Sequence, residues 1–260
     1  MEQPTIDALA RRLFDAAAEH RTVPMLTVDH ADLTEADAYR IQEALVGLHV
    51  AAGATRTGMK LGLTSKAKQR EMGIDVPIVG VLLDSLSIDP GVPFTVAALG
   101  QPRAEPEIAF LMARDLEGPG VTAAHVLAAT EGVMPALEIL DSRYDGYRFT
   151  LPDVVADQTS AGRFLLGGQL TSPRGFDLRL TGCVLSKNGE VAATAAGAAV
   201  SGHPAGAVAW LVRWLAARGR GLRAGDIVLS GGMTAVVPLS AGDVVSAAFD
   251  RLGTVTLACR

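Results

Sequence analysis

The N-terminal part of the chain carries apolar side chains at helical spacing. A first stripe has members three or four positions apart, namely Ile6, Leu9, Leu13 and Ala16. A second helix is expected behind Thr34, which can cap it with Asp37 three residues on, and Gly53 is expected to end it. Its buried stripe comprises Ala38, Ile41, Leu45 and Leu48. The pattern predicts a small N-terminal α-helical lobe over residues 1–57.

From residue 58 onward the pattern changes to short apolar runs punctuated by Gly, Pro and Asp. The expected strands are residues 78–83, 108–111, 137–140, 164–166, 180–185, 227–230, 244–249 and 255–258. Many short strands with turn residues between them indicate a barrel or a rolled sheet. Two helices interrupt them, one over residues 123–133 behind Thr122 and one from Pro204 to Gly219. The predicted fold class is therefore α+β.

Composition narrows the choice of function. Hydrophobic residues make up 49% and charged residues 20% of the 260 positions, as in an ordinary globular enzyme. The net charge of −5 and the lack of a concentrated basic face argue against nucleic acid as a partner. The two cysteines, Cys183 and Cys259, form no CxxC pair, so neither structural zinc nor a disulfide framework is expected. With no apolar run of about 18 residues and no signal-like start, we expect a cytoplasmic protein without a membrane span.

Three glutamates lie in or next to apolar segments, where a carboxylate is expected to need a compensating partner. Glu105 and Glu107, in QPRAEPEIAF, are two positions apart, so on a strand they share a face. Glu138 lies between aliphatic residues in ALEIL, where a buried carboxylate must be compensated. No trio of basic residues accompanies them, which favours a hard divalent cation as the partner. A solvent-facing position at the rim is the alternative for Glu105 and Glu107.

Lys60, in GMKLGLTSKAKQREMG, lies between apolar neighbours, and flanking glycines permit close approach of the backbone. A partly desolvated lysine can donate a proton or bind a carboxylate. The alternative is a lysine at a strand edge whose stem covers apolar surface while its ammonium stays in water. Lys66, Lys68 and Arg70 fit the outer face of a short helix, and no chemistry is assigned to them.

A loop of small polar residues, ADQTSAG at residues 156–162, can orient a substrate through its hydroxyls and backbone amides. Capping of a turn by Asp157 or Ser160 is the alternative. Asp141 and Arg143, just upstream, are expected to form a structural ion pair. The segment AATAAGAAV, residues 192–200, is expected to pack closely against a site or another subunit.

Other common site types are not indicated. The five histidines include no HExxH pair, and the chain has no GxGxxG, GxxxxGK[ST] or GxSxG motif. Zinc peptidase, nucleotide-binding and serine hydrolase chemistry are therefore not expected.

Four ordered segments together resemble a known family. They are GMKLGLTSKAKQREMGID, PRAEPEIAFL, PALEILDSRYDGYRF and VVADQTSAGRFLLGG. The family comprises the 2-oxo-acid decarboxylases and hydratases of meta-cleavage aromatic degradation, within the fumarylacetoacetate hydrolase superfamily. The likeness covers nearly the whole chain, from DAYRIQ near the start to SGGMTAVVPLSAGDVV and LGTV near the end. It implies a mixed β-roll catalytic domain over residues 58–260, a Mg²⁺ or Mn²⁺ ion, a small 2-oxo-acid substrate and a homo-oligomer.

Matched position by position, the resemblance implies roles for individual residues. Glu105, Glu107 and Glu138 correspond to the metal ligands. Lys60 corresponds to the active-site lysine, with catalytic and substrate-binding roles, and Ser160 lies in the substrate-binding loop. The usual Asp-Asn pair of that loop is Asp157–Gln158 here, and no role is carried over to either residue.

Two subfamilies differ in the details of these motifs. Resemblance to the 4-oxalocrotonate decarboxylases is carried by Pro102, Arg103, Pro106, Tyr144, Tyr147 and Phe149. The segment DVPIVGVLLD, residues 75–84, is closer to the vinylpyruvate hydratases. We therefore expect a carbon–carbon lyase that decarboxylates 2-oxo-3-hexenedioate to 2-hydroxypenta-2,4-dienoate. One alternative is a hydro-lyase that converts 2-hydroxypenta-2,4-dienoate to 4-hydroxy-2-oxopentanoate. Another is a non-catalytic subunit in complex with a hydratase.

Overall fold

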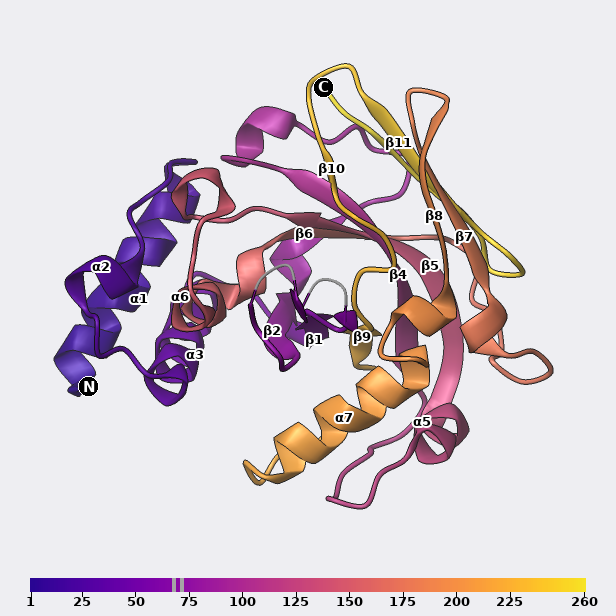
Figure 1. The fold of residues 1–260 in the computed structure, drawn as a ribbon, viewed down its shortest axis with the longest axis horizontal. Coiled ribbons are helices and arrows are strands. Elements are labelled where there is room, and N and C mark those ends of the chain that lie inside the picture. The colour runs from indigo at the N-terminus through magenta and orange to yellow at the C-terminus, as the bar shows by residue number, and fades with distance from the viewer. Residues whose placement is uncertain (67–68, 71–72) are drawn as a thin grey trace.

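Three helices begin the chain and pack at one side of the sheets, on the left in Figure 1. They are α1 (Gln3–Ala18), α2 (Leu26–Asp29) and α3 (Glu35–Ala51). The hydroxyl of Thr34 accepts a hydrogen bond from the backbone N–H of Asp37 at 3.1 Å, so the expected cap of the second long helix is confirmed. The apolar stripes of α1 and α3 are buried together with those of a later helix, α6 (Leu151–Ala156). The lobe boundary at residue 57 stays a prediction, because this core includes residues from beyond it.

The computed structural model describes residues 1–66, 69–70 and 73–260. Lys68, and with it part of the short helix expected around Lys66 and Arg70, lies outside the described residues. Among the described helices, none is both long and apolar enough to cross a membrane.

A mixed sheet forms the centre of the molecule. Its strands are β1 (Arg56–Gly62), β2 (Ile78–Leu83), β3 (Ser87–Ile88), β4 (Arg103–Met112), β5 (Thr130–Leu140), β6 (Ala161–Leu166), β9 (Ile227–Leu229) and β10 (Val237–Pro238). Their order is β2-β1-β9-β4-β5-β6-β3, with β10 paired to β4. The pairs β1–β9 and β3–β6 are parallel and the others antiparallel. The long strands β4 and β5 bring distant acidic segments of the sequence into register.

A second, antiparallel sheet covers β5 and β6, on the right in Figure 1. It has the order β12-β11-β7-β8, formed by β7 (Gly182–Lys187), β8 (Glu190–Ala196), β11 (Val244–Phe249) and β12 (Gly253–Ala258). Alternate residues of β11, such as Val245 and Ala247, point into the main core, as a half-buried strand requires. The predicted α+β class with a rolled mixed sheet is confirmed.

Two further helices, α5 (Ala123–Ala129) and α7 (Pro204–Ala216), lie below the sheets in Figure 1. Gly219 adopts a left-handed φ of 67°, and Arg220 N–H donates to Leu215 O at 3.0 Å, so the expected glycine lies in the turn that terminates α7 just after Ala216. The expected helix over residues 123–133 is wrong in its last turn. Residues from Thr130 onward belong to β5, where Thr130 pairs with Met112 and Val133 with Phe110. Long-range pairing overrides the helical pattern there.

Candidate active site

The acidic cluster is created by the register between β4 and β5. Glu105 on β4 lies directly opposite Glu138 on β5, and Glu107 is two positions further along the same face of β4. One carboxylate oxygen from each side chain lies within 4.8 Å of the others. Like charges placed opposite each other on neighbouring strands repel, so this register requires a compensating cation.

The three carboxylates are almost completely shielded from solvent. Glu105 is 5%, Glu107 0% and Glu138 2% exposed, so a solvent-facing rim position for Glu105 and Glu107 is wrong. Burial, and next the charges of Glu138 and Glu105, raise the pKa of Glu107 well above its ordinary value. Burial also raises the pKa of Glu138, although Lys60 opposes that shift.

Two carboxylate oxygens of the cluster lack a hydrogen-bond donor within the described part of the chain. Oε2 of Glu107 accepts a hydrogen bond from Gly231 N–H at 2.6 Å. Oε1 of Glu107 and Oε2 of Glu138 are buried and accept no hydrogen bond within the described part of the chain. Unsatisfied buried oxygens are costly, and an all-oxygen donor set suits a hard divalent cation. Glu105, Glu107 and Glu138 therefore fit a bound metal ion in both geometry and chemistry.

Lys60 on β1 reaches this cluster across the curved face of the sheet. Its Nζ lies 2.6 Å from Oε1 of Glu138 and donates to Thr159 O at 2.7 Å. In the strand order, β9 and β4 separate β1 from β5. Three steps of ~4.8 Å in a flat sheet would keep those strands about 14 Å apart, so the contact requires a strongly rolled sheet. The side chain is only 1% exposed, which excludes a lysine with its ammonium in water.

The loop at residues 157–160 has a strained backbone. Gln158, Thr159 and Ser160 have φ values of 54°, 51° and 57°, a left-handed region that such residues rarely occupy. Consecutive residues of this kind persist only where the surroundings hold them. The hydroxyls of Thr159 and Ser160 are buried without a hydrogen-bond partner in the described residues. Both residues line a cavity, so the loop presents polar groups to a ligand.

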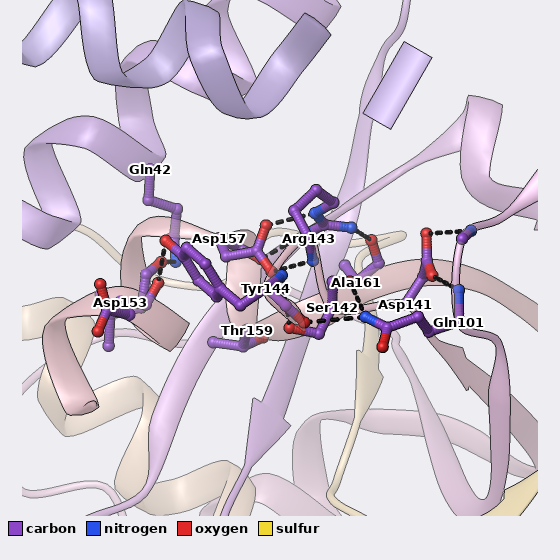
Figure 2. A network of polar contacts seen from close by, with 12 residues as sticks. Gln42, Gln101, Asp141, Ser142, Arg143, Tyr144, Asp153, Asp157, Thr159 and Ala161 are labelled. Atoms are coloured by element: carbon purple, nitrogen blue, oxygen red, sulfur yellow. Dashed lines mark hydrogen bonds and ion pairs between the residues drawn. The ribbon is translucent and has the colours of Figure 1, made fainter. Parts of the chain in front are cut away.

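Arg143 and Gln158 hold this loop in place, and Figure 2 shows Arg143 between Asp157 and Ala161. The guanidinium of Arg143 forms an ion pair with Asp157 and donates to Ala161 O at 2.8 Å. The amide of Gln158 bonds to both N–H and C=O of Val81 on β2. Both Asp157 and Gln158 therefore contribute contacts that hold the loop.

The expected ion pair between Asp141 and Arg143 is wrong. Asp141 instead accepts hydrogen bonds from the backbone N–H groups of Gly100 and Gln101, at 3.3 and 2.7 Å. Asp141 and Arg143 are only two positions apart, but this proximity in sequence does not bring their charged groups together. Arg143 instead pairs with the buried Asp157, which has no other cationic partner among the described residues.

Two glycines allow the elements around Lys60 to approach. A Cβ on Gly80 would lie 2.6 Å from the Thr159 hydroxyl and 3.0 Å from Cγ of Lys60. Gly231 has a φ of 111°, and a Cβ there would lie 2.0 Å from the hydroxyl of Thr64. Only glycine fits either position without displacing the site.

A cavity of about 820 Å³ opens onto the cluster. Its polar lining includes Lys60, Arg103, Glu105, Thr159, Ser160 and Thr194. Its apolar lining includes Leu63, Ile78, Leu140, Phe149, Val154, Met233 and Val236. Residues 194–196 and Ala199 of the segment 192–200 also line this cavity, but most residues of the segment are exposed, so its close packing stays a prediction. A small ligand with charged and apolar parts suits this lining.

Sequence reasoning did not identify two groups that complete the site. They are the carbonyl of Thr159, which accepts from Lys60, and the N–H of Gly231, which donates to Glu107. Backbone groups carry no side-chain signature. The pair Gly231–Gly232, one residue after the apolar run of β9, is the signal that indicates a close backbone approach.

The rolled mixed sheet and its buried acidic cluster define a class of protein. Residues 51–258 match the family model described as "Fumarylacetoacetate (FAA) hydrolase C-terminal", and the chain belongs to this family.

Individual relatives are similar over almost their whole length. The chain is 42% identical to a 4-oxalocrotonate decarboxylase from Pseudomonas sp. (strain CF600), over 96% of this chain and 94% of that protein. It is also 42% identical to a 2-hydroxyhexa-2,4-dienoate hydratase from Comamonas testosteroni, over 97% and 96%. The 4-oxalocrotonate decarboxylase from Pseudomonas putida G7, complexed with magnesium and adipate, superposes with a TM-score of 0.97 at 38% identity, over 100% and 99% of the chains.

Proposed function

We propose that this protein is a metal-dependent decarboxylase of 2-oxo-3-hexenedioate. The observation that carries the proposal is the trio of buried glutamates with two unsatisfied oxygens, adjacent to Lys60 and open to a cavity. The high structural similarity to a 4-oxalocrotonate decarboxylase crystallised with magnesium supports both the reaction and the metal.

Glu105, Glu107 and Glu138 would hold Mg²⁺, or Mn²⁺, through one carboxylate oxygen each. Bound there, the ion supplies a Lewis acid for the 2-keto oxygen and the adjacent carboxylate of the substrate. Glu138 also forms an ion pair with Lys60, so the same carboxylate would orient the lysine relative to the substrate.

The reaction breaks the bond between C5 and the C6 carboxylate and releases CO₂. The electron pair remains on C5 and is delocalised through the alkene to the oxygen on C2, and one proton added there gives 2-hydroxypenta-2,4-dienoate. Glu138 and Thr159 engage two of the three N–H donors of Lys60, which leaves one for that oxygen. A cationic donor at the atom where charge develops lowers the barrier. The apolar lining, with Leu140 and Phe149 among its residues, excludes water from the departing carboxylate.

The direct test is incubation of the purified protein with 2-oxo-3-hexenedioate and Mg²⁺. We expect stoichiometric release of CO₂ and formation of the dienoate. Glu107→Gln should abolish most of both signals while retaining the native circular dichroism spectrum. Absence of CO₂ release from the folded, magnesium-loaded protein would refute the proposed reaction.

Hydration of 2-hydroxypenta-2,4-dienoate is a second candidate, because the hydratase relative is as similar as the decarboxylase. Loss of the dienoate chromophore with formation of 4-hydroxy-2-oxopentanoate measures this activity directly. We expect a kcat/KM lower than that for decarboxylation. The reverse order would make the hydratase the correct assignment.

We further propose a homo-oligomer that works in the cytoplasm and can associate with the hydratase that consumes its product. Exposed apolar side chains on the outer sheet, such as Val184, Val191 and Val244, support burial against another subunit. The two cysteines are free and buried, which is compatible with a reducing compartment. Light scattering of the purified protein, alone and mixed with a hydratase, tests the assembly. A monomer with no mixed complex would contradict it. A complex without decarboxylation would favour the non-catalytic alternative.

A further inference from the structure

Arg103 shares a face of β4 with two of the clustered glutamates. Positions 103, 105 and 107 alternate along the strand, so their side chains project to the same side. Arg103 is half-buried, whereas Glu105 and Glu107 are buried. The strand thus carries a cation and two anions along one face, and Arg103 and Glu105 both line the cavity.

The side chain of Arg103 rests on an aromatic platform. Its guanidinium carbon lies 3.8 Å from the centre of the Tyr147 ring, a cation–π distance. The Tyr147 hydroxyl donates to Gln101 O at 3.0 Å, and Gly146 N–H donates to Oε1 of the same glutamine at 2.9 Å. Gln101 is held in turn by the carbonyls of Ser142 and Tyr144 (Figure 2). The platform is therefore fixed before any ligand binds.

The guanidinium of Arg103 retains its capacity to bind an anion. Within the described part of the chain, it makes no ion pair and no hydrogen bond, whereas the ammonium of Lys60 is paired with Glu138. An arginine presents a planar set of donors that matches a carboxylate in a bidentate manner. Among the lining cations in the described part of the chain, Arg103 is the one without a carboxylate partner, so its charge is available to an anionic group of a ligand.

We propose that Arg103, supported by Tyr147, binds the second carboxylate of a dicarboxylate substrate and so selects diacids over monoacids. This inference rests on the proposed function, in which the glutamate cluster binds the 2-oxo-acid end. Alternate residues on a strand are about 6.6 Å apart, which is close to the span between the two carboxyl carbons of an extended six-carbon diacid. Apolar residues of the lining, such as Leu140 and Met233, suit the hydrocarbon between the two ends.

This role places Arg103 in substrate selection and not in the chemical step. The carboxylate it binds is the one that leaves as CO₂, and its negative charge moves toward the C2 oxygen as the bond breaks. An interaction that weakens as the reaction proceeds lowers KM without raising kcat. Removal of the guanidinium should therefore raise KM for the diacid and leave kcat unchanged or higher.

The decisive measurement is calorimetric binding of 2-oxoadipate and 2-oxohexanoate to the magnesium-loaded protein. These saturated ligands differ only in the second carboxylate, so the ratio of their Kd values isolates its contribution. We expect the wild type to prefer 2-oxoadipate by roughly 10- to 100-fold, as a charge-assisted hydrogen bond provides. Arg103→Gln should reduce the ratio to near one by weakening only 2-oxoadipate. Arg148→Gln removes an exposed arginine that does not line the cavity and should leave the ratio unchanged.

Two outcomes would overturn the inference. One is a wild type without preference for the diacid, and the other is an Arg103→Gln variant that keeps the preference. If Arg103→Gln fails to fold, Tyr147→Leu serves instead. Loss of the aromatic platform should reduce the ratio of the two Kd values while the charge of Arg103 remains. An unchanged ratio in Tyr147→Leu would refute the proposal. CO₂ release by the wild type is assayed separately. Failure of the proposed reaction is thereby distinguished from failure of the diacid subsite.

Discussion

At the residue scale, the three buried glutamates differ in what holds each of them. Glu138 contacts Lys60, whereas Glu107 relies on the Gly231 N–H and is repelled by both neighbouring carboxylates. The two side chains therefore contribute differently to the stability of the metal-free protein, although both belong to the same acidic cluster.

We expect Glu138→Gln to destabilise the metal-free protein by about 3 kcal/mol, because it leaves the buried Lys60 without its anion. Glu107→Gln should instead stabilise it, by on the order of 1 kcal/mol, because it relieves repulsion between like charges. Urea unfolding of both variants in the presence of a chelator measures the two changes. Equal changes in the free energy of unfolding would contradict the assigned partners.

Lys60 is expected to matter more for turnover than for metal affinity, since it is the donor proposed to bind the C2 oxygen on which charge develops. Lys60→Met should lower kcat by roughly 10²- to 10⁴-fold, the usual contribution of a positioned proton donor. Magnesium affinity, followed by calorimetry, should change much less. Lys187→Met is a matched control, because Lys187 forms an ion pair with Asp243 on the outer sheet. An unaltered rate in Lys60→Met would exclude the role.

At the element scale, the sequence predicts the helices well and the strand lengths poorly. Periodicity and caps locate α1, α3 and α7 because those signals are local. The first half of β4 contains Arg103, Glu105, Pro106 and Glu107, which do not resemble a strand, and it is recognisable only through pairing with β5. The same pairing extends β5 back to Thr130, where a helix was expected.

The candidate site likewise has a part that the sequence predicts and a part that depends on tertiary structure. The three glutamates and Lys60 could be identified from the sequence, because charged residues seldom occur in apolar segments without a functional or structural partner. The Glu105–Glu138 register, the Arg143–Asp157 ion pair and the backbone groups of Thr159 and Gly231 depend on tertiary structure. No local pattern encodes them.

The close contact of β2 with the strained loop should make Gly80 sensitive to substitution. In Gly80→Ala, the new Cβ would displace Thr159 and Lys60, and a misplacement of about 1 Å can lower turnover roughly 100-fold. The control is Gly47→Ala in α3, where a Cβ meets nothing within 4 Å. That change should leave kcat intact and stabilise the helix by roughly 0.5–1 kcal/mol. Steady-state kinetics and thermal unfolding of both variants test the contrast, and a fully active Gly80→Ala would contradict it.

The N-terminal cap of α3 should produce a measurable pH dependence. The hydrogen bond from Thr34, and next the contact with the amino terminus, lower the pKa of Asp37 from 3.8 to about 2. A lowered pKa stabilises the fold above the ordinary value, and that stabilisation is lost as the pH falls through about 2. Thr34→Val should raise the titration midpoint of Asp37 in a carboxyl NMR experiment. Its stability deficit relative to wild type should shrink between pH 4 and pH 2. A midpoint near 2 in the variant would contradict the assigned cause.

At the scale of the whole molecule, the curvature of the rolled sheet holds three mutually repelling carboxylates together in the folded state. Lys60 from β1, the glutamates from β4 and β5, and the loop before β6 converge only because the sheet curves. Opening of that curve would let the carboxylates return to water. Clustering of the buried carboxylates therefore lowers the free energy of unfolding of the metal-free protein. A cation that binds only the native state should raise it.

We accordingly expect Mg²⁺ to raise the Tm of the chelator-treated protein. At a hundredfold excess over Kd, a ligand of the native state adds about 2.7 kcal/mol, which for a chain of this size corresponds to roughly 5–10 °C. Differential scanning fluorimetry over a magnesium series measures the shift, with potassium at equal ionic strength as the control. The shift should be largely lost in Glu107→Gln, which removes one donor charge, and retained in Arg148→Gln. A wild-type Tm that is independent of magnesium would show that the three carboxylates do not bind the ion, since specific binding to the folded state alone must shift the unfolding equilibrium.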